Sequence, residues 1–572
     1  MAKAYKGFMP EWEHEAPPKR SYRSILKWGN PTEFKSPNEG LYKVIKQTFN
    51  LTDDYFKEKQ EVGLEEVDVE VPINLSEEQV NKFIKIVSND NVKLDTYTRL
   101  KVSYGNTMID LMRLRKKIIE NIPDIVLYPS NKTQIEQIVS YCSDQKIPIY
   151  CKSGGSTVTR GMEAMKGGVS LDLAVNFNKV ISFNEKNQTI TVESGIQGPQ
   201  LEEVLNNAQE RLGAKRKYTC GHFPQSFEYS GVGGWVVTRG AGQNSSYYGK
   251  IEDIVICQEY ATPIGIIKTE EYPAKATGPS IDQIMIGNEG TFGVLTHVTL
   301  KVFKYMPENR IRFSYIFPSW ENAQAAAREI TQGEFGMPSV FRLSDPEETS
   351  FMLKLYNVEG TKLDTIMKKK GFKHMERCLF LGFTDGEAGF CKNMKKKLNR
   401  ICKKYGAMYL TGYPTKQWEK GRFKDPYLRD ALGDFGIVID TMECAVTWDT
   451  MGEVHRGLRE YCKARPETVC MTHMSHVYPQ GANLYFIFIA KMDMEEYIDY
   501  QAGILDNYVK YGAAISHHHG IGKSFGPWLE HSIGENCYDI IRTLKKHFDP
   551  DNIMNPGGTL GLDVKQRELK YK

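Results

Sequence analysis

The sequence predicts an α+β fold with two main domains, and three observations support this prediction. The chain has 572 residues, which is more than one hydrophobic core usually supports. Between residues 123 and 305, short apolar runs typical of strands alternate with amphipathic helices and glycine-rich loops. After residue 306, two strand–helix–strand patterns follow one another, which is typical of a ferredoxin-like domain.

In chain order, we expect four parts. Residues 1–122 form an N-terminal extension and helical lead-in, because charged, proline-containing stretches precede one helical pattern near 108–118. Residues 123–305 form the first α+β domain, and 306–530 form a cap that contacts the substrate. Residues 531–572 form a C-terminal helix and a tail that returns to the first domain.

Apolar periodicity places the individual elements. Alternating or short apolar runs predict strands in the first domain, and an apolar stripe at helical spacing predicts its helices. The strands are expected at 124–129, 147–151, 169–173, 180–183, 189–192, 254–262, 265–268 and 298–303, and the helices at 131–145 and 197–210. In the cap we expect strands at 310–317, 339–343, 378–383, 407–410 and 483–489, and helices at 319–331 and 386–404, before a last helix at 533–547.

Composition bounds the class of protein. The hydrophobic fraction of 41% and the charged fraction of 25% are ordinary for a soluble globular protein. A formal charge of +3 gives no indication of nucleic-acid binding. The eleven cysteines include no C-x-x-C pair, which favours free thiols in a reducing compartment. No apolar run approaches a membrane span, and the amino terminus lacks the apolar core of a secretory signal.

The glycine-rich stretch 219–256 is the organising element of the first domain. It holds seven glycines among small and aromatic residues, so its backbone can approach a ligand closely. Val236 stands where a dinucleotide fingerprint needs glycine, which disfavours a nicotinamide site. Two more glycine loops lie at 153–157 and 287–296. A tight turn or a plain connection explains any one loop, but three in one domain favour a large bound cofactor.

Several motifs resemble a known superfamily. The segments PDIVLYP, SGGST, CGHFPQSFEYSGVGGW and GNEGTFGV, in this order, resemble the flavin-binding half of the vanillyl-alcohol oxidase superfamily. Within it, YPQGANLYFIF at 478–488 and SHHHGIGK at 516–523 are similar to the alkylglycerone-phosphate (alkyldihydroxyacetonephosphate) synthase family, as are LKWG at 26–29 and the stretch 99–115. The resemblance implies a two-subdomain FAD-binding fold of the vanillyl-alcohol oxidase type with a ferredoxin-like cap.

The resemblance also implies FAD bound without a covalent link. The pyrophosphate is expected near 153–157, and the isoalloxazine ring near 231–235 and 238–242. The expected cofactor-binding residues are Ser153, Gly154, Gly155, Ser156, Thr157, Pro224, Ser230, Gly233, Gly234, Thr238, Gly240, Glu252, Ile254, Glu289, Gly290, Gly293 and Val294.

In this family the flavin acts without net oxidation. Its N5 attacks C1 of acyl-dihydroxyacetone phosphate, the fatty acid leaves, and a long-chain fatty alcohol takes its place to form the ether bond of ether lipids. The residues leave two other functions open. One is an FAD-dependent 2-hydroxyacid dehydrogenase or oxidase, because the tail DNIMNPGG resembles the tails of such dehydrogenases. The other is a flavoprotein that only binds lipid.

Matching the family's motifs to this sequence gives the expected active-site residues. Tyr485 is the expected catalytic tyrosine, and since a phenol titrates near 10, it needs a lowered pKa or a relay to move a proton. His517, His518 and His519 can supply that relay. Arg342 is expected as a further catalytic residue, and Arg429 and Thr441 are expected to bind substrate. Alone, either arginine reads as an ion-paired residue and Tyr485 as a core tyrosine.

We expect no metal and no nucleotide P-loop. Three adjacent histidines rarely converge on one ion, and no separate cluster with ligand spacing accompanies them. His517 occupies the first glycine position that a P-loop ending at GIGKS would require.

Partners and location follow mainly from the resemblance. We expect a homodimer whose basic runs at 368–370 and 392–404 read as solvated faces or as a contact with anionic membrane. The family implies a peroxisomal location, yet the chain ends Lys570-Tyr571-Lys572 and shows no clear targeting signal. A cytoplasmic or membrane-associated location is the alternative. Ser153 departs from relatives that carry a third glycine there.

Overall fold

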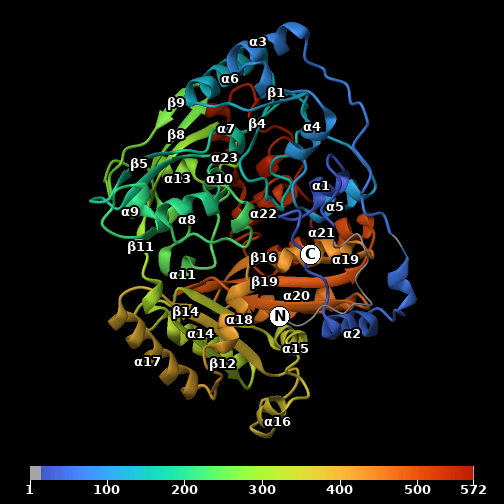
Figure 1. Cartoon of the computed structure of the whole chain (residues 1–572), viewed down its shortest axis with the longest axis vertical. Coiled ribbons are helices and arrows are strands. Elements are labelled where there is room, and N and C mark those ends of the chain that lie inside the picture. Colours follow the sequence, from blue (N-terminus) through green and yellow to red (C-terminus); the bar gives the residue numbers. More distant parts are fainter. Residues whose placement is uncertain (1–14, 59, 571–572) are drawn as a thin grey trace.

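The computed structural model describes residues 15–58 and 60–570. The amino-terminal stretch and the last two residues, on which the targeting predictions partly depend, lie outside the described residues. Figure 1 shows an upper half, built mainly from the first 300 residues, and a lower half formed by the cap. Across the described residues, no helix is both long and apolar enough to cross a membrane.

The first sheet contains the predicted strands β2 (Ile125–Leu127), β3 (Ile149–Lys152) and β4 (Val169–Asp172). Both β2 and β3 run parallel to β4, which lies between them. Helix α6 (Lys132–Gln145) covers this sheet with α3 (Glu77–Val87), and β1 (Val92–Lys93) adds an antiparallel edge. The segment 77–93 was expected in the extension, but its apolar residues are part of this core.

The second sheet is antiparallel, in the order β5-β6-β10-β8-β9. Its strands are β5 (Val180–Asn184), β6 (Thr189–Glu193), β8 (Val255–Thr262), β9 (Gly265–Lys268) and β10 (Val294–Lys301). Helices α8 (Gly198–Asn206) and α10 (Val232–Val237) share its core. The strand predictions for both sheets are confirmed, although β10 begins four residues before the predicted strand.

The cap begins with the predicted ferredoxin-like unit. Strands β12 (Ile311–Phe317), β13 (Val340–Ser344), β14 (Cys378–Thr384) and β15 (Met408–Tyr409) pair in the spatial order β15-β12-β14-β13. Helices α14 (Trp320–Thr331) and α17 (Ala388–Lys404) follow β12 and β14, as the βαββαβ pattern requires.

A second unit of the same kind extends this sheet, which the sequence did not predict. It contains β16 (Ile437–Thr447), α20 (Met451–Ala464), β17 (Val469–Met474), β19 (Gly481–Lys491) and α21 (Met494–Lys510). Pairing of β13 with β17 joins the two units into one sheet. An isolated bridge from Ala514 to Ala445 of β16 occupies the place of the fourth strand.

The N-terminal extension binds both halves through α1 (Tyr22–Leu26), α4 (Thr96–Ser103) and α5 (Met108–Arg115). The guanidinium of Arg23 makes two hydrogen bonds, of 2.8 and 2.7 Å, to the carboxylate of Asp434. Arg115 adds a third bond of 2.6 Å to the same carboxylate. Arg23 and Asp434 are both buried, so removal of one partner would leave an uncompensated charge.

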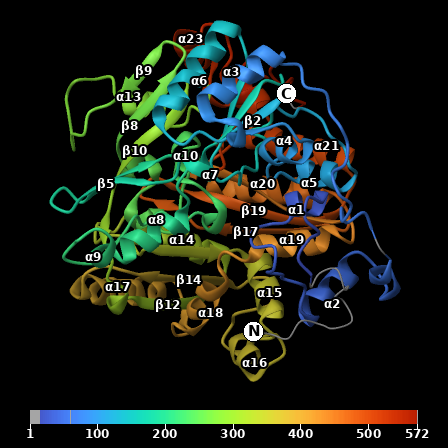
Figure 2. The ribbon, with the colours of Figure 1, turned by 45° about the horizontal axis from the view of Figure 1, so that its top comes forward.

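The tail returns to the upper half. Helix α23 (Glu535–Phe548) places Phe548 on Phe292 with ring centroids 5.2 Å apart, and Figure 2 shows α23 near α6. Ile149 of β3 donates to Ile553 and accepts from Asn555 through the backbone. The remaining elements are α2 (Glu39–Thr48), α7 (Leu173–Asn176), α9 (Ala208–Arg211), α11 (Ser245–Tyr248), α12 (Ile251–Ile254), α13 (Ile281–Met285), α15 (Pro346–Leu355), α16 (Lys362–Lys369), α18 (Tyr413–Gly421), α19 (Asp425–Gly433), α22 (Leu529–Ile533), β7 (Tyr218–Thr219), β11 (Phe303–Lys304) and β18 (Val477–Tyr478), with short 3-10 turns between them.

Candidate active site

The three glycine loops converge around α10. The loop at 153–157 lies so close to the 229–231 segment that a Cβ on Gly154 would stand 2.4 Å from the Tyr229 carbonyl oxygen. A Cβ on Gly231 would stand 1.9 Å from the Ser153 hydroxyl. The third loop is bonded to the end of α10, where the Glu289 amide donates to Val237 at 2.8 Å. Glycine is therefore required for the loops to meet.

Gly234 provides the clearest sign of room for a cofactor. A Cβ on Gly234 would meet no atom of the described residues within 4 Å, whereas one on the preceding Gly233 would lie 2.7 Å from the Ser194 carbonyl oxygen. Nearby, both ring nitrogens of His222 and one oxygen of Glu252 are buried with no hydrogen-bond partner among the residues that the structure describes. Open backbone beside unpartnered polar atoms fits a large polar cofactor.

The other predicted cofactor residues fall into two groups. Loop residues offer side chains or amides near α10: the Thr238 hydroxyl donates to Gly234 at 2.8 Å, and the Ser230 hydroxyl accepts from the Trp235 indole at 2.8 Å. Core residues can offer only backbone, because Ile254 and Val294 are buried. The loop group also includes Gly155, Ser156, Thr157, Pro224, Gly240 and Gly290, and Gly293 precedes β10 in the core group.

Glu289 links the glycine loop at 287–296 to the histidine loop, which is the segment 516–523 that carries the three adjacent histidines. Its two carboxylate oxygens accept the backbone N–H groups of Ile521 at 2.6 Å and Gly522 at 2.7 Å. Burial raises the pKa of Glu289 to about 7, although both amide bonds favour the charged form. The residue predicted to bind cofactor thus also positions residues 516–523.

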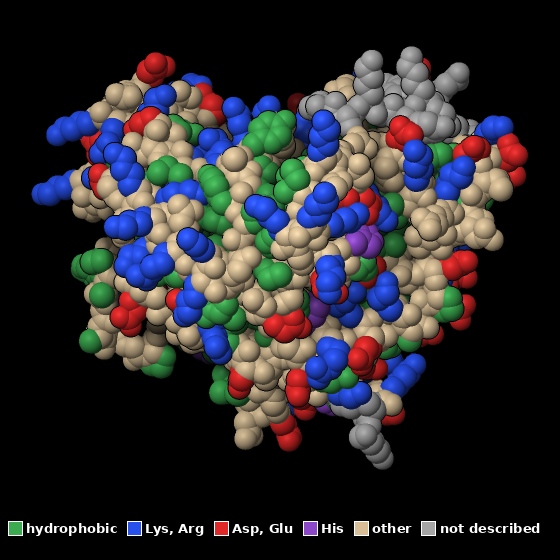
Figure 3. Space-filling model, turned by 90° about the horizontal axis from the view of Figure 1, so that it is seen from below, with side chains coloured by type: hydrophobic (Ala, Val, Ile, Leu, Met, Phe, Trp, Pro, Cys, Tyr) green, Lys and Arg blue, Asp and Glu red, His purple; other side chains and the backbone are tan. Residues whose placement is uncertain are grey.

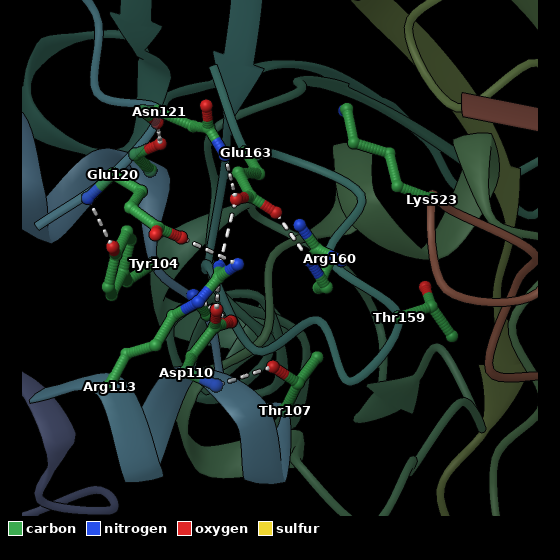
Figure 4. A network of polar contacts seen from close by, with 12 residues as sticks. Tyr104, Thr107, Asp110, Arg113, Glu120, Asn121, Thr159, Arg160, Glu163 and Lys523 are labelled. Carbon is green, nitrogen blue, oxygen red and sulfur yellow. Dashed lines mark hydrogen bonds and ion pairs between the residues drawn. The ribbon is translucent and has the colours of Figure 1, made fainter. Parts of the chain in front are cut away.

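A buried polar network anchors the segment that follows the 153–157 loop (Figure 4). The Glu163 carboxylate accepts from Arg113 of α5 at 2.9 Å, from Asn121 at 2.8 Å and from Arg160. The backbone carbonyl of Thr159 accepts two amides from residues 523 and 524. The N-terminal extension, the segment that follows the glycine loop at 153–157 and the histidine loop are therefore linked.

Tyr485, on strand β19 of the cap sheet, lies close to two of the three histidines. The Tyr485 hydroxyl donates to the Thr441 hydroxyl at 3.0 Å. The Tyr485 ring lies 6.0 Å from the His518 ring and 5.5 Å from the His519 ring, measured between centroids. His517 points elsewhere and contacts the Tyr478 hydroxyl at 2.8 Å. The structure thus brings together Tyr485, Thr441, His518 and His519.

Glu443 organises this cluster, and sequence reasoning missed it. Its fully buried carboxylate accepts the backbone N–H groups of His517, His518 and His519 at 2.8 to 3.0 Å. It also accepts from the Ser516 hydroxyl at 2.9 Å. Glu443 lies opposite Tyr485 in the pairing of β16 with β19. Its place two residues after Thr441, on the same strand face, was the available signal.

Arg342 reaches the cluster through His473. Its guanidinium contacts the His473 ring at 3.1 Å and Glu348 at 2.7 Å, and His473 stacks on Tyr485 at 4.9 Å between centroids. Burial opposes ionisation of Glu348, but Arg342 and His473 outweigh it and lower its pKa to about 2. Arg342 is therefore ion-paired with Glu348, and it is connected to Tyr485 through His473.

Arg429 of α19 lies apart. Its hydrogen bonds among the described residues run to Asn106, at 2.6 Å to the carbonyl and 3.1 Å to the side chain, rather than to Tyr485. It lines a cavity of about 970 Å³ with apolar residues that include Met108, Leu111 and Met492.

Burial sets the protonation of the cluster. It raises the pKa of Tyr485 well above its ordinary value, so the phenol stays protonated. Burial lowers the pKa values of His517, His518 and His519, so the imidazoles are neutral at pH 7. Tyr485 does not have the lowered pKa that a direct base needs, which leaves a relay through neutral imidazole.

Gly234→Leu is expected to give a folded protein that does not bind FAD, because the side chain would fill the space beside α10. Gly452→Leu is the matched control, since a Cβ at this exposed position of α20 also has no neighbour within 4 Å in the described part of the chain. The absorbance of purified protein near 450 nm, together with its circular dichroism, measures both properties. A Gly234→Leu protein with bound flavin would show that α10 does not border the cofactor.

Two family models match the chain in the halves just described. The model described as FAD binding domain matches residues 123–270. The model described as FAD linked oxidases, C-terminal domain, matches residues 306–559. FAD is therefore the cofactor of this chain.

Individual relatives narrow the family. The chain is 30% identical to an alkyldihydroxyacetonephosphate synthase of Dictyostelium discoideum over 488 residues, which covers 82% of this chain and 78% of the relative. A solved structure of an alkyldihydroxyacetonephosphate synthase superposes with a TM-score of 0.71 at 27% identity, covering 86% of each chain. The 4-ethylphenol oxidase of Gulosibacter chungangensis, at 15% identity, shares the fold with a TM-score of 0.66 and covers 86% of this chain and 99% of its own. The chain belongs to the alkyldihydroxyacetonephosphate synthase family.

Proposed function

We propose that this protein exchanges the acyl chain of acyl-dihydroxyacetone phosphate for a long-chain alcohol, with FAD bound and no net redox change. The main observation behind the proposal is the cluster of Tyr485, His518 and His519. Glu443 bonds the backbone of this cluster, and Glu289 connects the histidine loop to the glycine loop at 287–296. A protonated phenol beside neutral imidazoles suits proton transfer at the substrate carbon that loses a carboxylate and gains an alcohol oxygen.

Each group has a distinct role in this proposal. FAD, held by the glycine loops around α10, would supply a nucleophilic ring nitrogen for the substrate carbon. A neutral imidazole of His518 or His519 accepts a proton at C1 or from the incoming alcohol, and Tyr485 donates to the oxygen that departs. Arg342 orients His473 against the Tyr485 ring. We assign substrate contact to Thr441, because its hydroxyl accepts from Tyr485.

The test is turnover without an electron acceptor. The purified FAD-bound protein is incubated with palmitoyl-dihydroxyacetone phosphate and hexadecanol, and the products are measured by mass spectrometry. Release of fatty acid with formation of alkyl-dihydroxyacetone phosphate supports the proposal. Absence of product, together with flavin reduction by a 2-hydroxy acid, would indicate a dehydrogenase instead.

We further propose that the cavity beside Arg429 receives a long hydrocarbon chain. Its walls combine methionine and leucine side chains with the buried guanidinium of Arg429, and charged residues such as Glu61, Lys117 and Glu496 line it as well. Flexible methionines adapt to chains of different length, and a fixed positive charge suits the carboxylate of a departing fatty acid. Arg429 is then a substrate-binding residue at a distance from Tyr485.

The lower tip of the cap has the composition of a membrane contact. Leu363 and Ile366 of α16 are 46% and 48% exposed, and Lys369 and Lys370 follow them. Figure 3, seen from below, shows basic side chains distributed over this face. On α17, Lys392, Lys396 and Arg400 are exposed. Lys395 does not join them, because its amine lies 3.7 Å above the Tyr409 ring and burial lowers its pKa to about 8.

Leu363→Asp combined with Ile366→Asp is expected to abolish most binding to vesicles that contain phosphatidylserine, since the apolar anchor is replaced by charge that anionic lipid repels. Ile181→Asp is the control, because Ile181 is 50% exposed in the other half. Co-sedimentation at low and physiological salt measures binding. Equal vesicle binding by the wild-type protein and the Leu363→Asp, Ile366→Asp variant would exclude this tip as the membrane contact.

A homodimer is also part of the proposal, with sedimentation velocity as its measurement. The peroxisomal location stays a prediction from the family.

A further inference from the structure

We propose that His476, His517 and His518 form a binding site for a divalent zinc ion. Potential ligand nitrogens of the three side chains all lie within 4.8 Å of one another. The sequence argued against a metal because the adjacent histidines lacked a distant partner, and the fold supplies that partner from the turn between β17 and β18. His476 is buried and lies 5.1 Å from His517 and 4.9 Å from His518 between ring centroids.

Hydroxyl groups contact one ring nitrogen of His476 and one of His517. The Nδ1 atom of His476 meets the Ser245 hydroxyl at 2.9 Å, so its Nε2 is available. The Nε2 atom of His517 meets the Tyr478 hydroxyl at 2.8 Å, and its Nδ1 contacts the Nδ1 of His518, a contact that a bound ion would replace. The second ring nitrogen of a zinc-bound histidine is usually hydrogen-bonded to a carboxylate, a backbone carbonyl or water, and here hydroxyls take that role.

The separation of two of the nitrogens suits a shared ion. The Nδ1 atoms of His517 and His518 are 3.1 Å apart, close to the spacing of two imidazole ligands about 2.0 Å from one tetrahedral zinc. The Glu443 carboxylate lies 3.7 Å from the Nδ1 atom of His518 and provides compensating negative charge. Three neutral imidazoles with a nearby carboxylate favour Zn²⁺ over Mg²⁺ or Ca²⁺, which prefer oxygen ligands.

Zinc at this site would inhibit the reaction, and this consequence rests on the proposed function. A bound ion takes up the lone pair of His518, which then cannot accept a proton beside Tyr485. Removal of the ion by a chelator restores the imidazole. The site would thus make the enzyme sensitive to free zinc, without zinc being a cofactor.

The experiment measures zinc binding and needs no turnover. FAD-bound protein is treated with EDTA, desalted, and titrated with Zn²⁺ in competition with a chromogenic chelator. We expect one Zn²⁺ per chain, an affinity reduced by more than about 100-fold in His476→Ala, and a reduction of about 10- to 100-fold in Tyr478→Phe. His374→Ala is the control and retains binding, because His374 is an exposed residue beside Glu359.

Two results would overturn the proposal: no saturable zinc binding to the wild-type protein, or equal affinity in wild type and His476→Ala. If His476→Ala loses FAD, Tyr478→Phe carries the test, and an unchanged zinc affinity there contradicts the site. Because the readout is binding, a protein that lacks synthase activity but binds zinc would refute only the proposed function.

Discussion

Tyr485→Phe is expected to lower the rate of acyl-for-alkyl exchange by about 10²- to 10⁴-fold, the usual contribution of one acid–base group, while FAD stays bound. The variant removes only the hydroxyl that donates to Thr441, and it leaves the ring that stacks between His473 and His518. Product formation under saturating substrate measures the rate, and the visible spectrum measures bound flavin.

Tyr315→Phe is the matched control for this change. Tyr315 is also a tyrosine of the cap sheet, but it is fully buried and its hydroxyl donates to Asn399, outside the Tyr485 cluster. Its loss is expected to alter stability more than the rate. A wild-type rate in Tyr485→Phe would remove Tyr485 from the chemistry and return it to a packing role.

Glu443→Gln is expected to reduce the rate by about 100-fold or more without loss of FAD. The amide has nearly the same shape, but its NH₂ group would face backbone N–H donors that now bond a carboxylate. Hydrogen bonds to a charged group are worth about 1.5–3 kcal/mol each, so the loss of two disorders the loop that carries the histidines. Hydrogen exchange of the amides at 516–519, together with the rate, measures the effect.

Glu321→Gln serves as the control, because Glu321 is an exposed carboxylate in the first turn of α14. It should change neither property. Unaltered amide protection in Glu443→Gln would show that Glu443 does not hold the loop, whatever happens to the rate.

The parts that sequence predicted well have strong local signals. The SGGST and GNEGTFGV loops can be recognised in the sequence by their glycines, and the structure brings both to α10. At the first loop, Gly154 and Gly231 approach neighbouring atoms too closely for a side chain to fit. The strands and helices of the first ferredoxin-like unit follow from apolar periodicity, which is local. Family resemblance located Tyr485 and the histidines, and the structure brings Tyr485 to His518 and His519.

The parts that sequence did not predict depend on pairing between distant strands. Glu443 contacts the histidine loop because β16 pairs with β19 in a register that sets Glu443 opposite Tyr485. His473 reaches Tyr485 by the same kind of pairing on the other side of β19. His476 approaches His517 only because the chain turns after β17. None of these registers can be read from one strand alone.

The buried ion pair between Arg23 and Asp434 affects how the protein is made. The two residues are 411 positions apart, so at about 5–20 residues per second the ribosome delivers the carboxylate roughly 20 to 80 s after the guanidinium. Until then α1 can pack against α5 and bond the backbone of residues 63 and 65, but the carboxylate that accepts from its guanidinium has not been made. The ion pair that fastens α1 to the end of α19 therefore forms only after most of the chain has been synthesised, and before the strands β16, β17 and β19 of the second cap unit follow.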